Sequence, residues 1–127
     1  MNLEKVIFAF FIVFAATLNF GFFIGDIGRP ELHNIYELFA AIVVNMIATV
    51  LKFGDRTQIG AVLLSTSLVA DIQLITAAIL WTVVVHVIGT GMTTANTASV
   101  VSLAGGALLA NIISVIMLIV ETVMMRR

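Results

Sequence analysis

The chain has 127 residues, of which 61 % are hydrophobic and 10 % are charged, and its mean hydropathy is +1.20. Soluble domains carry roughly 25 % charged residues, so this composition excludes a soluble globular domain and indicates a polytopic α-helical membrane protein. The net charge of −1, the lack of a basic stretch and the lack of cysteine exclude nucleic-acid binding, disulfides and thiolate chemistry. We therefore predict an all-α fold, a four-transmembrane-helix bundle that forms a single transmembrane domain over residues 1–127.

The first two apolar runs predict two crossings joined by a short polar turn. They cover about residues 5–24 and 35–51, each close to the roughly 20 residues with which a helix spans a bilayer. Between them, Gly28 and Pro30 stand among charged residues, which is typical of an aqueous loop.

The third apolar run, residues 59–88, is longer than one crossing requires. As a helix it measures about 45 Å, against a hydrocarbon core of about 30 Å. Two structures explain the excess: one long helix, or a break near residues 65–67, where three hydroxyls compete for backbone hydrogen bonds. We favour one helix, which places Asp71 near the bilayer midplane. The fourth crossing is predicted at about residues 100–123.

Basic residues predict the orientation of the four crossings. An even number of crossings puts both termini and the second connection on one side of the membrane. Positive charge favours the cytoplasmic side, so we expect both termini in the cytoplasm, in a bacterial inner (plasma) membrane. The two sides differ by five basic residues to one: Lys5, Lys52, Arg56, Arg126 and Arg127 against Arg29.

Small residues recur every fourth position in two of the predicted crossings. Lipid tails are as apolar as leucine, so helices associate in a bilayer where small residues allow close backbone approach. These seams either pack helices within one subunit or join subunits. Four short helices leave little room for an internal path, so passage of a solute predicts a homo-oligomer with a shared axis. The seams are Ser102, Gly106, Ala110 and Ser114 in the fourth crossing and Thr17, Gly21 and Gly25 in the first.

Polar side chains converge at the predicted midplane. Asp71, Asn45 and Asn111 lie near the middle of the third, second and fourth crossings, and a central aspartate disfavours insertion by roughly 2.5–3.5 kcal/mol. Carboxylate and carboxamide oxygens replace part of the hydration shell of a cation, so we predict an ion-binding or pore site. The alternative is that the asparagines join helices and Asp71 begins a shorter crossing. Three further candidates lie nearby: Gln73, Thr76 and Ser114.

These patterns predict an ion channel or transporter that passes a small cation as a homo-oligomer. The alternative is a non-conducting accessory or scaffold subunit that binds partner membrane proteins through the small-residue seams. Paired aspartates, a Ser/His pair and a His-rich cluster are all missing from the sequence, so we expect no enzyme. The expected environment is the lipid bilayer, with no cofactor, no bound metal centre and no nucleic acid.

Overall fold

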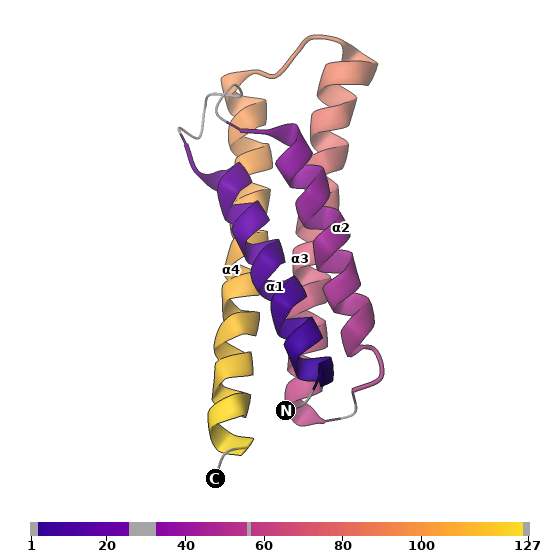
Figure 1. The fold of residues 1–127 in the computed structure, drawn as a ribbon. Helices are drawn as coiled ribbons and strands as arrows, with labels where there is room; N and C mark the ends of the chain where they lie inside the picture. Colours follow the sequence, from indigo (N-terminus) through magenta and orange to yellow (C-terminus); the bar gives the residue numbers. More distant parts are fainter. Residues whose placement is uncertain (1–2, 26–32, 56, 126–127) are drawn as a thin grey trace.

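The structure, a computed structural model, describes residues 3–25, 33–55 and 57–125 (Figure 1). These residues form an all-α four-helix bundle, which confirms the predicted fold class. Its helices are long and apolar enough to span a membrane. They are α1 (Leu3–Phe23), α2 (Ile35–Lys52), α3 (Gln58–Thr82), which continues into the π-helical segment η2 (Val83–Ile88), and α4 (Thr94–Met125).

The helices run alternately up and down, so each packs antiparallel to its neighbour in the chain (Figure 1). α1 packs on α2 and α4, and α3 packs on α2 and α4, which closes the ring. α1 begins and α4 ends at the same end of the bundle as the α2–α3 connection. We call this the terminal end.

Small side chains let the helices approach closely in the core. Most of the larger of two core clusters lies in the half of the bundle away from the terminal end, and alanine is its most frequent residue. The smaller cluster surrounds Phe8 and Leu118 at the terminal end. Large apolar side chains such as Phe10, Ile72 and Ile116 are exposed on the outside. An apolar outer surface on membrane-length helices means that this protein contacts the lipid bilayer.

The third helical segment is continuous from Gln58 to Ile88, without a break at residues 65–67. The Thr66 hydroxyl donates to backbone oxygens of its own preceding turn, so it does not interrupt the helix. The segment begins after Thr57, whose Oγ1 accepts a hydrogen bond from Gly60 N at 2.9 Å. It ends at Gly89, whose φ of 77° is the left-handed conformation that favours glycine after a helix.

The predicted fourth crossing is shorter than the observed helix, because α4 already begins at Thr94. The polar run before residue 100 reads as a loop, yet two of its threonines stabilise a helix start. Thr93 Oγ1 accepts from Asn96 N at 3.1 Å, and Thr97 Oγ1 donates to Thr93 O at 2.8 Å. The Thr93 hydroxyl thus pairs with one of the backbone N–H groups that a helix start leaves unpaired, and the Thr97 hydroxyl adds a second hydrogen bond to a carbonyl of this first turn.

The orientation prediction falls partly outside the described residues, namely for Arg29, Arg56, Arg126 and Arg127. The two described lysines lie together at the terminal end. Lys5 Nζ pairs with Glu121 Oε1 at 2.6 Å, and Lys52 Nζ with Asp55 Oδ2 at 3.4 Å. That this end faces the cytoplasm stays a prediction.

Candidate functional site

Asp71 lies in the interior of the bundle, held by two side chains of α2. Its Oδ1 accepts a hydrogen bond from Asn45 Nδ2 at 2.6 Å, and its Oδ2 accepts one from Thr49 Oγ1 at 2.6 Å. The residue is 8 % exposed. Because it stands close to the middle of the span Gln58–Ile88, its carboxylate lies neither at a kink nor at a helix end.

Thr49 is not among the site residues predicted from the sequence. It follows Asn45 by four residues, so both side chains lie on one face of α2 and reach the same carboxylate. Thr49 Oγ1 also lies 3.0 Å from Asn45 O. Asn45 Nδ2 has a second acceptor, Ser67 O, at 3.2 Å. The spacing from Asn45 is the signal in the sequence that identifies Thr49.

Several buried polar atoms at about the depth of Asp71 have no hydrogen-bond partner in the described part of the chain. They are Asn45 Oδ1, Ser67 Oγ and both the nitrogen and the oxygen of the Asn111 side chain. Leaving such a group unpaired destabilises a protein by about 1–3 kcal/mol. The hydrocarbon core of a bilayer contains no water that could pair with it. Unpaired oxygens at the depth of a carboxylate are therefore free to coordinate a ligand.

Two contacts between α3 and α4 fix the height of Asn111. The Thr66 and Ser114 hydroxyls share a short hydrogen bond. Further along, a Cβ added to Gly106 would overlap Gln73 Oε1, so the Gln73 side chain lies against that glycine. Because the helices are antiparallel, these contacts bracket Asn111, which lies between Gly106 and Ser114 on α4.

The same two contacts bracket Ser67 and Asp71 on α3. Asn111 therefore lies at the depth of residues 67–71 of α3, and it is 0 % exposed. We call this set of residues the polar layer. Its members are Asn45, Thr49, Ser67, Asp71 and Asn111.

The other predicted site residues lie at the edge of this layer or apart from it. Ser114 pairs with α3 through Thr66, and Gln73 covers Gly106, so both join α3 to α4. Thr76 is exposed and donates to Ile72 O of its own helix at 2.7 Å. It points away from the layer because it lies five residues beyond Asp71, which is about 140° around the helix.

The predicted seam of α4 is largely used inside the bundle. Gly106 and Ser114 contact α3, and Ala110 is buried, whereas Ser102 is exposed.

On α1, the Glu37 carboxylate from α2 lies against Gly21. Thr17 is exposed and donates to Phe14 O at 2.8 Å, and Gly25 lies beyond the helix with a φ of 121°.

Asn19 is a third buried asparagine, and the sequence-based candidates do not include it. With its carboxamide turned to suit its neighbours, Asn19 Nδ2 donates to Ala104 O at 3.0 Å and its Oδ1 accepts from Leu108 N at 2.9 Å. Asn19 thus joins α1 to the backbone of α4. Asn111, equally buried, has no such partner among the described residues.

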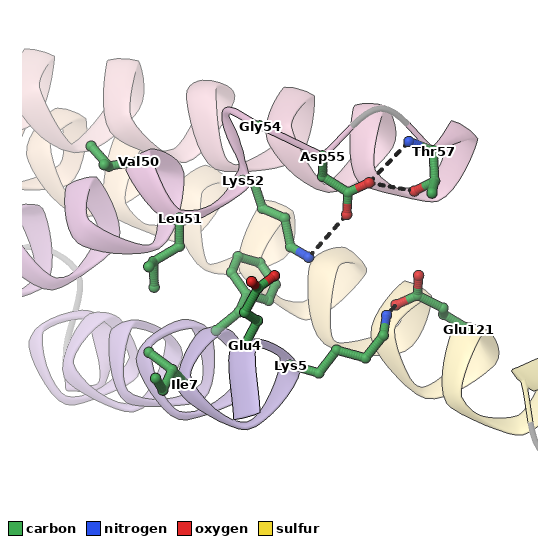
Figure 2. A pocket seen from close by; sticks show the side chains of 11 residues that line it. Glu4, Lys5, Ile7, Val50, Leu51, Lys52, Gly54, Asp55, Thr57 and Glu121 are labelled. Atoms are coloured by element: carbon green, nitrogen blue, oxygen red, sulfur yellow. Dashed lines mark hydrogen bonds and ion pairs between the residues drawn. The ribbon is translucent and has the colours of Figure 1, made fainter. Parts of the chain in front are cut away.

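A charged cavity of about 800 Å³ opens at the terminal end. Figure 2 shows Lys52 paired with Asp55, and Lys5 paired with Glu121 across the cavity. Lys52 Nζ also lies 4.3 Å from the centre of the Phe8 ring. We call this the terminal cavity.

The Asp55 carboxylate of the terminal cavity is well satisfied by hydrogen bonds. Its Oδ1 accepts from Thr57 N at 2.9 Å and from Thr57 Oγ1 at 2.7 Å (Figure 2). These hydrogen bonds, followed by the nearby Lys52 ammonium, lower the pKa of Asp55 below its ordinary value of 3.8.

These features define a small multi-span membrane protein with a buried polar layer and a charged cavity at one end. Residues 32–122 match DUF6394, described as a family of unknown function, and the chain belongs to this family. No curated protein and no solved structure gives a significant match.

Proposed function

We propose that this protein passes a small cation across a bacterial plasma membrane, with Asp71 as the cation-binding carboxylate. One observation carries the proposal: an acidic side chain that is 8 % exposed, near the middle of a membrane-spanning helix, clamped by Asn45 and Thr49. A charged group at this depth is costly, and such groups mark ion pathways in membrane proteins.

The terminal cavity supports the proposal because one of its lining residues lies about one helical turn from the polar layer. Lys52 lines the cavity. Lys52, Thr49 and Asn45 are all buried. These three residues follow one face of α2 at spacings of three and four. Thr49 therefore lies about one helical turn, roughly 5 Å, beyond Lys52.

In this proposal the terminal end faces the cytoplasm, and the protein is not an enzyme. The proposal also keeps the homo-oligomer, as the common state of small membrane proteins. The polar layer itself is built from helices of one chain, so a shared axis is not needed to complete the cation site.

The test is ion flux in vesicles that contain the purified full-length protein. Gradients of Na⁺, K⁺ or H⁺ are imposed in turn, and ion movement is followed with ion-sensitive dyes. We expect flux of at least one cation. Asp71→Asn should lower it by about tenfold or more, because one charged ligand is worth more than about 1.4 kcal/mol of binding.

Thr76→Val is the matched control for Asp71→Asn. It alters a polar side chain of the same helix that points away from the polar layer, so flux should stay at the wild-type rate. Equal flux through wild type and Asp71→Asn would contradict the assignment of Asp71. No flux of any cation through the wild type would contradict the proposed function.

A second candidate function is the non-conducting accessory subunit. An apolar groove between α2 and α3, with a volume of about 360 Å³ and side chains such as Ile42 and Ile75, favours it. A groove of this kind can seat a transmembrane helix of a partner protein. Vesicles without flux, together with a membrane protein that co-purifies through this groove, would favour the accessory role over transport.

A further inference from the structure

We infer that the cation bound at the polar layer is a partly dehydrated monovalent ion of about the size of Na⁺, ligated by Asp71 together with Asn45, Ser67 and Asn111. This inference rests on the proposed function and adds to it the class of ion and two ligands, Ser67 and Asn111. It is carried by a different observation, the unpaired buried oxygens.

Charge balance favours a monovalent ion. Among the described residues of the polar layer, Asp71 is the one that carries a charge. Lys52, one turn away, is paired with Asp55 and lies over the Phe8 ring. A single carboxylate neutralises one positive charge, whereas a divalent ion would leave one uncompensated charge at membrane depth, which is costly.

The unpaired atoms favour a metal ion over a proton. A proton on the Asp71 carboxyl adds one O–H donor, which pairs with one acceptor at most and leaves the other buried oxygens unpaired. An ion beside that carboxylate gains oxygen ligands from Asn45 Oδ1, Asn111 Oδ1 and Ser67 Oγ. A water retained by the ion accepts the remaining hydrogen bond from Asn111 Nδ2.

The packing around the layer favours a small ion. Ala48, Ala70, Ala107 and Ala110 are buried on the three helices that form it, and such side chains allow close approach of the helices. The layer offers one carboxylate and three neutral oxygens, far fewer than the rings of oxygens that coordinate K⁺ in channel filters. Hard oxygen ligands in a small space suit Na⁺ or Li⁺.

The experiment measures thermal unfolding of the purified full-length protein in detergent, at constant ionic strength, in NaCl, LiCl, KCl or choline chloride. A ligand that binds only the folded state raises the Tm as its concentration exceeds the Kd. We expect Na⁺ to raise the Tm by several degrees relative to choline, and K⁺ to have little effect. Calorimetric titration with Na⁺ then gives the Kd.

Asn111→Leu is the decisive variant. If Asn111 is a ligand, the leucine removes an unpaired polar group, so the Tm without Na⁺ stays equal to that of wild type or rises. The Na⁺-dependent increase is lost, and the Kd for Na⁺ rises by about tenfold or more. A purely structural asparagine would lower the Tm in every salt and leave the response to Na⁺ unchanged.

Asn19→Leu is the matched control, since Asn19 is as deeply buried but hydrogen-bonded to α4. Its Tm should fall in all salts, with the Na⁺ response retained. An unchanged Na⁺ response in Asn111→Leu would overturn the inference. So would a wild-type Tm that responds to pH but not to Na⁺, which would indicate a proton. Either result leaves the proposed function standing if vesicle flux depends on Asp71, whereas loss of all flux removes the function itself.

Discussion

Asp55 and Asp71 are two aspartates in different surroundings. Asp71 lies at membrane depth, and its hydrogen-bond donors come from another helix, so it joins α2 to α3. Asp55 lies at the rim of the terminal cavity, and most of its donors come from Thr57, two residues away. The first carboxylate depends on tertiary packing and the second mainly on local backbone geometry.

The lowered pKa of Asp55 predicts a pH dependence of stability. A carboxyl whose pKa is lower in the folded state stabilises the protein above its unfolded pKa, and this contribution is lost as the pH falls through the folded value. Asp55→Asn should therefore lower the Tm at pH 7, and the difference from wild type should shrink below about pH 4. Thermal unfolding in detergent across this range measures it, and a difference that is constant with pH would contradict the prediction.

At the scale of the element, the start of α3 depends on one residue. Thr57 Oγ1 accepts from Gly60 N at the first turn and donates to Asp55. The hydroxyl thus satisfies one of the unpaired backbone donors of the helix and holds the α2–α3 connection against it.

Thr57→Ala should destabilise the bundle by about 1 kcal/mol, the usual cost of removing an N-cap side chain. Thr57→Ser keeps the hydroxyl and is the matched control, with stability close to that of wild type. Unfolding in graded denaturant measures both variants. Equal losses in the two would show that the Thr57 methyl group, and not the cap, stabilises this connection.

For the whole molecule, the up-and-down arrangement puts both ends of the described chain at the terminal end, with the polar layer well inside the bundle. The basic residues in the sequence predict that this end faces the cytoplasm. Under the proposed function, the orientation decides which side of the membrane the terminal cavity faces.

Because the sequence has no cysteine, single introduced cysteines report orientation directly. Gly54 lies in the α2–α3 connection and Thr90 in the connection that precedes α4, at opposite ends of the bundle (Figure 1), and both are exposed. A Cβ on Gly54 meets open space. With a membrane-impermeant maleimide on spheroplasts, Thr90→Cys should react at once and Gly54→Cys only after permeabilisation. The reverse pattern would place the terminal end outside, and labelling of both variants in intact cells would indicate mixed orientation.

The sequence by itself determined the number and order of the membrane-length helices and placed Asp71 near the middle of one of them. Hydropathy and segment length are local properties, and they follow from the thickness of a bilayer and from the need of every backbone group for a partner. They place Asp71, Asn45 and Asn111 near the centres of their helices, and one clue in the sequence, the spacing of four from Asn45, points to Thr49.

Only the tertiary structure decided which faces of the helices meet. In water the apolar face of a helix marks the core, but in a membrane the core and the lipid are both apolar, so the pattern does not reveal how each helix is rotated. That rotation turns Thr76 outward and brings Thr49 to Asp71. It also leaves Asn111 without a partner among the described residues, whereas Asn19 binds the backbone of α4. Contacts between helices fixed the geometry of the polar layer, because each partner stands on a different segment of the chain.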